Sequence, residues 1–170
     1  MGNGKVAKNM TGKDPLEGKR ILIVDDEPDV LQLLEELLSM CRVSKAHNFE
    51  EAEEKLKNGY FDMAVLDIMG VNGYKLLEIA NDKDVIAVML TANALSVEDT
   101  IKSFKEGAAS FVPKEAMSGI ATYLRDILEA KSKGKSFWWR WMDRLGTYYD
   151  RKFGENWQDK NKEFWRFFPY

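Results

Sequence analysis

The chain has 170 residues, of which 45% are hydrophobic and 31% are charged, and its net charge is −3. This length suits one compact domain with a smaller segment left over, and the composition excludes wholesale disorder. The longest apolar runs, such as residues 85–90, are too short to span a bilayer, and the polar amino terminus lacks the apolar stretch of a secretory signal. The single cysteine, Cys41, cannot form an internal disulfide. We therefore expect a cytoplasmic protein.

Charged and aromatic residues divide the chain into three parts. Residues 1–18 carry a net charge of +1, residues 19–131 of −8 and residues 132–170 of +4. All five tryptophans and 13 of the 20 aromatic residues lie in the last 39 positions. This division predicts a flexible leader over residues 1–18, an acidic core domain over residues 19–131 and a basic, aromatic, helical extension over residues 132–170.

Short apolar segments recur through the core domain and are its predicted strands. They cover residues 20–24, 43–46, 61–66, 85–90 and 110–112, mostly without polar alternation, as expected of strands covered on both faces. Apolar residues at helical spacing lie between them, over residues 30–38 and 74–79, and again over residues 120–128. The alternation predicts an α/β fold, namely a doubly wound, five-stranded parallel sheet with helices on both faces.

Polar residues follow the ends of four predicted strands. Asp25 and Asp26 follow the first strand, Asp67 the third, Thr91 the fourth and Lys114 the fifth. The carboxyl ends of parallel strands meet at one rim of the sheet, where ligands bind. We therefore expect three carboxylates, a hydroxyl and an ammonium group to converge.

Such a rim favours phosphoryl transfer. Clustered carboxylates repel one another, and Mg²⁺, which prefers carboxylate and phosphate oxygens, relieves that repulsion. A carboxylate beside Mg²⁺ can attack phosphorus and form an aspartyl phosphate. Lys114 would then neutralise one phosphoryl oxygen, and Thr91 would donate a hydrogen bond to another.

Residues 19–131 resemble the receiver domain of bacterial two-component response regulators. The motifs that carry the resemblance, in family order, are Val24-Asp25-Asp26-Glu27, Leu66-Asp67-Ile68-Met69, Leu90-Thr91-Ala92 and Phe111-Val112-Pro113-Lys114. The resemblance implies the flavodoxin-like receiver fold. It also implies a phosphorelay role, in which the domain takes a phosphoryl group from a histidine kinase or a phosphotransfer protein.

The resemblance further implies a role for each matched acid. Asp67 would be the phosphoacceptor, modified during signalling, and would hold Mg²⁺ directly together with Asp26. Asp25 would act mainly through water, and the backbone carbonyl of Met69 would complete the protein ligands.

Three other matched residues would serve catalysis and the conformational switch. Thr91 and Lys114 would contact the phosphoryl group during transfer. Thr91 and Phe111 match the family's switch pair, in which the hydroxyl moves towards the phosphoryl group and the aromatic ring turns inward behind it. Output in the family usually leaves through the region that corresponds to residues 96–130.

Two features depart from the family pattern. The stretch over residues 70–73 is shorter by about two residues and has no proline. Lys114 is followed by Glu115, where the family commonly has a proline, often after a cis bond. A cis bond without proline costs about 3 kcal/mol, so the alternatives are a trans bond or a strained one. We expect both departures to affect the rate more than the reaction.

The extension has its own helical pattern. Helical spacing predicts a helix over residues 136–153 that ends at Gly154. Its apolar stripe is Trp138, Trp141, Met142, Leu145, Tyr148 and Tyr149. A second segment has Trp157, Phe164 and Phe168 on one side and could form another helix.

The sequence leaves open what covers these aromatic faces. The alternatives are the chain's own receiver domain, a second copy in a homodimer, or a downstream protein. The tryptophans available for such a downstream protein are Trp138, Trp141, Trp157 and Trp165. Acids interrupt the polar face and argue against a membrane surface, and no motif or dense basic stripe indicates nucleic acid.

The leading prediction is a phosphorylation-dependent response regulator whose output is a protein–protein interaction. It would not be an enzyme, beyond catalysing its own Mg²⁺-dependent phosphorylation and dephosphorylation. The alternative is a constitutive scaffold that keeps the receiver shape and acts through its Trp-rich tail. A hydrolase with an aspartyl-phosphate intermediate is the weakest reading, because no separate general acid is present.

Overall fold

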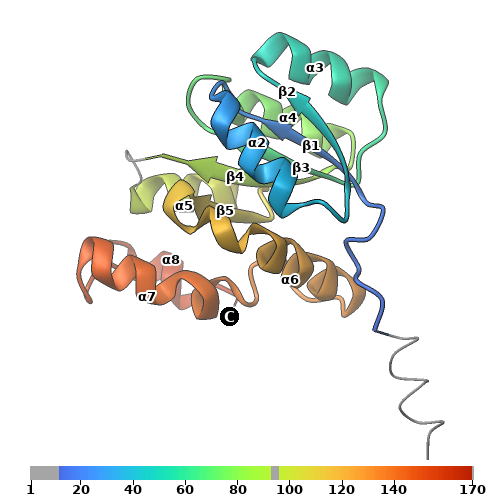
Figure 1. Cartoon of the computed structure of the whole chain (residues 1–170). Coiled ribbons are helices and arrows are strands. Elements are labelled where there is room, and N and C mark those ends of the chain that lie inside the picture. Colours follow the sequence, from blue (N-terminus) through green and yellow to red (C-terminus); the bar gives the residue numbers. More distant parts are fainter. Residues whose placement is uncertain (1–11, 93–95, 170) are drawn as a thin grey trace, which may run out of the picture.

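Five strands form one parallel sheet in the order β2-β1-β3-β4-β5 in the computed structural model, which describes residues 12–92 and 96–169 (Figure 1). The strands are β1 (Arg20–Val24), β2 (Arg42–Ala46), β3 (Met63–Asp67), β4 (Ile86–Thr91) and β5 (Ser110–Pro113). The predicted five-stranded parallel sheet is therefore confirmed, with strand bounds that differ from the predicted ones by at most two residues.

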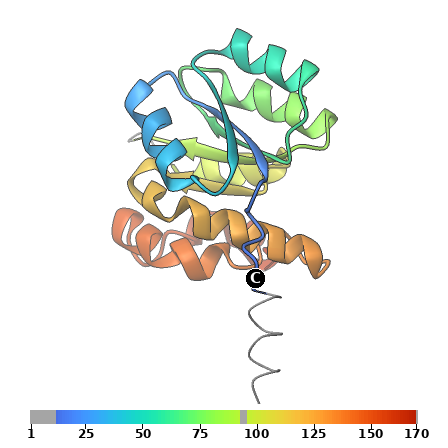
Figure 2. The ribbon, with the colours of Figure 1, turned by 45° about the vertical axis from the view of Figure 1, so that its right-hand side comes forward.

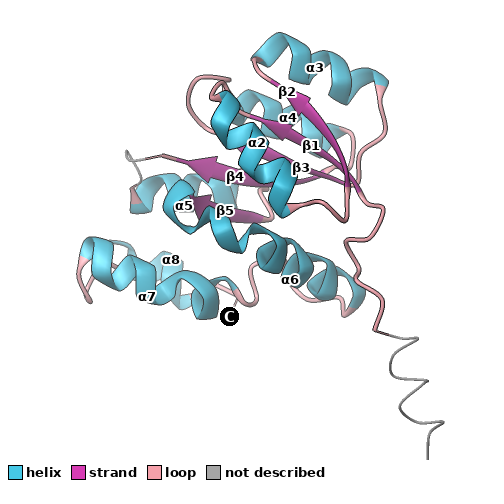
Figure 3. Cartoon of the chain, viewed as in Figure 1, coloured by secondary structure: helices cyan, strands magenta, loops and turns pink. Residues whose placement is uncertain are grey.

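Helices cover both faces of this sheet (Figure 3). The α-helices are α2 (Pro28–Leu37), α3 (Phe49–Asn58), α4 (Gly73–Asp82), α5 (Val97–Lys105), α6 (Ile120–Ser132), α7 (Trp141–Phe153) and α8 (Lys162–Arg166), and the 3₁₀ helices are η1 (Lys114–Gly119) and η2 (Asp159–Asn161). Helices α2 and α6 lie on one face, and α3, α4 and α5 on the other. The fold is thus the predicted doubly wound α/β architecture.

Alternating side chains of β1 build the two halves of the core. Ile21 and Ile23 pack with α2 and α6, whereas Leu22 and Val24 pack with the helices of the opposite face. Successive side chains of a strand point to opposite faces, so a strand covered on both sides must be apolar throughout. This is why the predicted strands read as unbroken apolar runs.

The aromatic extension packs on its own receiver domain. Helices α7 and α8 lie beyond β5 and against α5 and α6 (Figures 1 and 2). Six aromatic side chains of the extension are buried there: Trp138, Trp141, Tyr149, Trp157, Trp165 and Phe168. The first of the three alternatives left open by the sequence is therefore the one observed.

This packing does not support the alternative in which Trp138, Trp141, Trp157 and Trp165 bind a downstream protein. Their exposed fractions are only 3%, 4%, 7% and 4%, because all four rings pack against one another or against the receiver domain.

None of the helices in residues 12–92 and 96–169 is long and apolar enough to cross a bilayer.

The first helix of the extension begins later than predicted. Helix α7 starts at Trp141 and not at residue 136, because residues 137–140 form a turn. The Ser136 hydroxyl accepts a hydrogen bond from the Trp138 backbone N–H, and the Trp138 carbonyl accepts one from the Trp141 N–H. The turn directs the Trp141 indole to Phe111 in β5 and the Trp138 indole to Ala108, which lies just before β5. Gly154, with φ of 87°, ends the helix as predicted.

The second segment contains only a short α-helix. Helix α8 spans five residues and follows the 3₁₀ helix η2, so Trp157 lies in a turn before it.

The described part of the leader is anchored to the receiver domain. Leu16 is fully buried under α2 and α6, and its carbonyl accepts a hydrogen bond from the Cys41 thiol. The Asp14 carboxylate forms two hydrogen bonds with the Arg125 guanidinium, at 3.0 and 2.7 Å. The remaining leader, residues 1–11, lies outside the described residues.

Candidate functional site

The carboxyl ends of β1, β3 and β5 bring three charged side chains together. The Lys114 Nζ atom lies 2.8 Å from Asp25 Oδ2 and 3.5 Å from Asp67 Oδ1. It also lies 3.1 Å from Glu27 Oε1, a contact that the motifs did not predict. Residues separated by up to 89 positions thus meet because the parallel crossovers return each strand to the same rim.

Burial sets the electrostatics of this rim. Asp25 is fully buried and Asp67 is 3% exposed, whereas Asp26 and Glu27 are exposed. Burial, followed by the charge of Asp25, raises the pKa of Asp67 to about 7. Burial likewise raises the pKa of Asp25 above its ordinary value.

Lys114 provides the compensating charge. Burial lowers the pKa of Lys114, but hydrogen bonds to Asp25 and Glu27 and the charge of Asp67 outweigh it, so that the pKa lies above its ordinary value. The ammonium group therefore stays charged at any physiological pH. Excess negative charge nevertheless remains at the rim.

The acidic cluster fits a hard divalent cation. One carboxylate oxygen from each of Asp25, Asp26 and Glu27 can be chosen so that all lie within 4.8 Å of one another. The charge of Asp26 also acts on Asp67, which places the two predicted direct ligands in one electrostatic neighbourhood. An all-oxygen donor set with excess negative charge suits Mg²⁺.

Glycines let the loop after β3 close over these acids. A side chain on Gly73 would collide with the Asp67 carbonyl oxygen, so only glycine fits where α4 begins. Gly70 has φ of 78°, and a Cβ there would lie 2.5 Å from Asp26 Oδ2. Asn72 takes the left-handed conformation, with φ of 52°. The shortened stretch therefore still reaches the acidic rim.

Gly70→Ala should disturb the acidic cluster directly. The new methyl group must displace the Asp26 carboxylate, and the positive φ strains any L residue. We expect Mg²⁺ affinity to fall by about tenfold and stability by about 1 kcal/mol. Gly134→Ala is the matched control, because Gly134 has φ of 65° but nothing within 4 Å of its Cβ position. Gly134→Ala should lose stability but keep the wild-type affinity for Mg²⁺. Urea unfolding measures the stability and isothermal titration the affinity. Equal Mg²⁺ affinities in the two variants would contradict the prediction.

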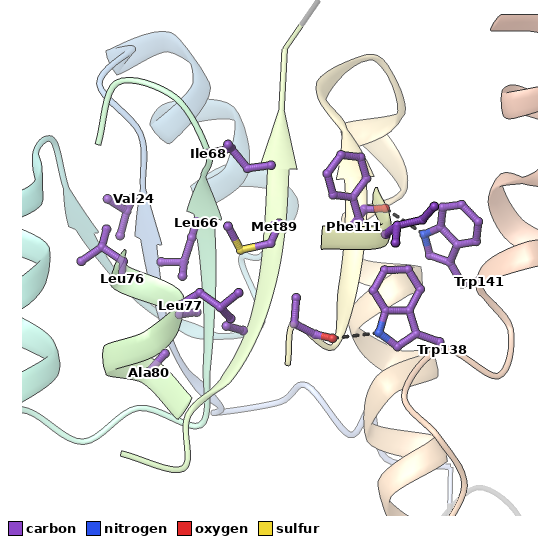
Figure 4. Packing of buried hydrophobic residues seen from close by; sticks show 14 of the residues in the cluster. Val24, Leu66, Ile68, Leu76, Leu77, Ala80, Met89, Phe111, Trp138 and Trp141 are labelled. Carbon is purple, nitrogen blue, oxygen red and sulfur yellow. Dashed lines mark hydrogen bonds between the residues drawn. The ribbon is translucent and has the colours of Figure 1, made fainter. Parts of the chain in front are cut away.

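The other predicted residues lie around the same rim. Thr91, 3% exposed, ends β4 one residue beyond Leu90, which pairs with Asp67 in the sheet. Phe111 lies in β5 and is fully buried, and its carbonyl accepts a hydrogen bond from the extension (Figure 4). Met69 lies in the loop after β3 and is 64% exposed.

The bond after Lys114 raised the alternative of a cis or strained peptide. The described peptide bonds, including the one between Lys114 and Glu115, are all trans. The chain continues directly into η1 after β5, and Lys114 still reaches Asp25.

The raised pKa of Asp67 predicts a cost of ionisation. The ordinary pKa is 3.8 and the folded pKa about 7, so the folded chain binds this proton more tightly than the unfolded chain does. Stability therefore falls as pH rises between these values, and the loss is complete above the folded pKa. Without divalent cations, Asp67→Asn should be more stable than the wild type by about 1–3 kcal/mol at pH 8, and nearly equal to it at pH 4.

Urea unfolding in EDTA at both pH values measures this difference. Glu155→Gln removes an exposed acid of the extension and serves as the control, with stability close to that of the wild type at both pH values. An Asp67→Asn variant no more stable than the wild type at pH 8 would show that the rim is not electrostatically strained.

Comparison with known proteins identifies the family. Residues 21–125 match the response regulator receiver domain. The chain is 35% identical over 103 residues to the two-component response regulator ARR18 of Arabidopsis thaliana, covering 57% of this chain and 16% of that protein. It is 38% identical over 117 residues to the probable transcriptional regulator ycf27 of Guillardia theta, covering 63% of this chain and 46% of that protein. The chain thus spans about half or less of the length of these curated relatives.

A solved receiver domain has a similar fold. A CheY-like response regulator receiver domain protein from Methanospirillum hungatei JF-1 has a similar fold, with a TM-score of 0.62 and 26% identity over 69% of this chain and 99% of that one. Since the family match covers more than half of the chain, the protein belongs to the response regulator receiver domain family, whose members are signalling domains rather than conventional enzymes.

Proposed function

We propose that this receiver domain accepts a phosphoryl group on Asp67 in two-component signal transduction. The observation that carries the proposal is the ammonium group of Lys114 between the buried carboxylates of Asp25 and Asp67, at 2.8 and 3.5 Å. A histidine kinase or a phosphotransfer protein would be the donor. Output would be a protein–protein interaction.

Each rim residue has a role in the proposed transfer. An Asp67 carboxylate oxygen attacks phosphorus, and the new O–P bond forms as the P–N bond to the donor histidine breaks, with its electron pair leaving on the imidazole. Lys114 neutralises a phosphoryl oxygen, and the Thr91 hydroxyl donates a hydrogen bond to another. Thr91 and Phe111 would then form the switch pair.

The acids and the loop after β3 would hold the cation. Asp26 and Asp67 would bind it directly, Asp25 through water, and the Met69 carbonyl would complete the set. Mg²⁺ held there would offset the negative charge of the rim and of the phosphoryl oxygens. The acidic cluster of Asp25 and Asp26 supports this assignment, and Glu27 adds a third carboxylate near it.

The scaffold alternative loses its main support. It required the tryptophans of the extension to be available to a partner, and Trp138, Trp141, Trp157 and Trp165 are buried. A phosphorylation-dependent output is therefore the better proposal. The cytoplasmic location remains a prediction.

Incubation with acetyl phosphate and Mg²⁺ tests the proposal. We expect the wild type to give a retarded band on a phosphate-affinity gel, and the band to disappear when EDTA replaces Mg²⁺. Asp67→Asn should give no retarded band, whereas Asp62→Asn, at the opposite end of β3, should behave as the wild type. A retarded band of equal intensity in Asp67→Asn would refute the assignment of the acceptor.

A further inference from the structure

The extension occupies the face of the receiver domain that α5, β5 and α6 form. In both ribbon views, α7 and α8 lie directly against this face and beyond the edge strand β5 (Figures 1 and 2). The same region, residues 96–130, is where the family resemblance placed the output surface. The segment that covers this face therefore determines whether another molecule can bind there.

Apolar contacts tie the extension to α5. The ring of Phe104, on α5, has centroid distances of 5.3 Å to Trp138, 5.3 Å to Phe164 and 5.5 Å to Phe168. The hydroxyls of Thr100 and Tyr149 are hydrogen-bonded to each other, and both side chains are almost completely buried. A helix that carried these residues on an open surface would leave a large apolar patch.

Two indole groups bind the backbone at the edge of the sheet. Trp138 Nε1 donates to the Ala108 carbonyl at 2.8 Å, and Trp141 Nε1 donates to the Phe111 carbonyl at 2.9 Å (Figure 4). Edge strands offer backbone groups to which another chain can pair. Here part of that edge is already occupied by side chains of the same molecule.

Ion pairs extend the contact to α6 and η1. Arg144 makes two hydrogen bonds to the Asp126 carboxylate, at 2.8 and 3.0 Å. Lys152 Nζ lies 3.6 Å from Glu115 Oε1. The extension therefore contacts every element of the face.

We propose that residues 136–168 are a permanent lid, which folds and unfolds with the receiver domain and closes the α5–β5–α6 face to a second copy of the chain. A second copy would have to displace the Phe104 cluster, both indole hydrogen bonds and the Arg144–Asp126 pair together. Coupling between two sites of a protein typically changes an equilibrium by about five- to 150-fold, too little to expel a segment held in this way. Output must leave through another surface, which includes the outer side of the lid itself.

Native-state hydrogen exchange of the full chain tests the lid. If the lid opens only when the whole domain unfolds, amides of α7 should have protection factors within about tenfold of those in the inner strand β4. Protection in α7 more than about 100-fold below that of β4 would show that the lid detaches alone, and would overturn the proposal.

Trp141→Phe sharpens this test, because it removes the indole donor and keeps an aromatic ring. The proposal expects protection to fall by the same factor, roughly fivefold, in α7 and β4. A fall confined to α7 would contradict it. Trp139→Phe removes a longer indole hydrogen bond, 3.4 Å to the Asp126 carbonyl, at a half-exposed position, and should lower protection by a smaller factor that is again equal in α7 and β4. Should Trp141→Phe fail to fold, Arg144→Gln weakens the lid at its ion pair with Asp126. An equal fall of protection in α7 and β4 would again support the lid, and a fall confined to α7 would contradict it.

Beryllofluoride with Mg²⁺ separates the lid from the proposed phosphorylation. The expected results are an unchanged monomeric mass by light scattering and unchanged protection in α7. A dimer with deprotected α7 amides would overturn the lid, whereas a dimer with protected α7 would use another surface and support it. If beryllofluoride left amide exchange in the loop after β3 unchanged, that result would count against the proposed function alone. The exchange of α7 and β4 without ligand would still show whether the lid opens by itself.

Discussion

Lys114→Met should lower the free energy of unfolding by about 3 kcal/mol at pH 8, because it leaves the buried charges of Asp25 and Asp67 without their cation. The side chain of Lys114 is only 14% exposed, and its nitrogen is the ion-pair partner of Asp25 Oδ2. Methionine keeps the aliphatic volume, so the loss reports the charge and not a cavity. Urea unfolding in EDTA gives the number.

Two companion variants identify the cause of that loss. Lys75→Met breaks an exposed pair with Glu78, whose side chains are 51% and 64% exposed, and should cost less than about 0.5 kcal/mol. Adding Asp25→Asn to Lys114→Met should restore part of the stability, because one of the uncompensated buried charges is gone. A double variant less stable than Lys114→Met would contradict the electrostatic explanation.

Trp141→Ala should destabilise the whole protein by about 3–5 kcal/mol, the usual cost of removing a large buried aromatic side chain. Trp141 is 4% exposed and packs against Tyr149 and Trp138 at centroid distances of 4.8 and 5.5 Å. Its loss also leaves the Phe111 carbonyl without the indole donor. Far-UV circular dichroism is the appropriate probe of unfolding, since the substitution removes a fluorophore.

Trp139→Ala is the matched control two positions away. Trp139 is only half-buried, and its ring lies under Lys135 and Arg140 at 4.0 and 4.4 Å. Removal of such surface cation–π contacts should cost about 1 kcal/mol. If Trp141→Ala and Trp139→Ala lost equal free energy of unfolding, the buried contacts of Trp141 would contribute no more than the surface contacts of Trp139.

The fold and the rim could be predicted because both depend on local patterns. Unbroken apolar runs identify strands covered on both faces, and parallel strands bring their carboxyl ends together whatever their separation in sequence. The convergence of Asp25, Asp67 and Lys114 follows from that rule. Apolar spacing does not predict helices α3 and α5. Their N-caps are the stronger signal, since the Asn48 and Ser96 side chains accept hydrogen bonds from the N–H groups of Glu51 and Asp99.

The remaining features depend on tertiary contacts that no pattern encodes. The apolar stripe of the extension identified a face that must be buried, but an apolar stripe carries no information on what covers it. Leu16 looked like part of a polar leader, because one leucine among Gly and Lys has no periodicity. Sequence also does not show that Lys114 Nζ lies closer to Asp25 than to Asp67, at 2.8 against 3.5 Å, because this depends on side-chain conformation.

Chemical trapping of the phosphoryl group tests the central claim most directly. After reaction with acetyl phosphate and Mg²⁺, borohydride reduces an acyl phosphate to an alcohol, so a phosphorylated aspartate becomes homoserine in the peptide mass spectrum. The proposed site requires this conversion at Asp67 alone, and its loss when EDTA replaces Mg²⁺. Conversion at another acid, or none under conditions in which the chain is folded, would contradict a phosphoacceptor site at this rim.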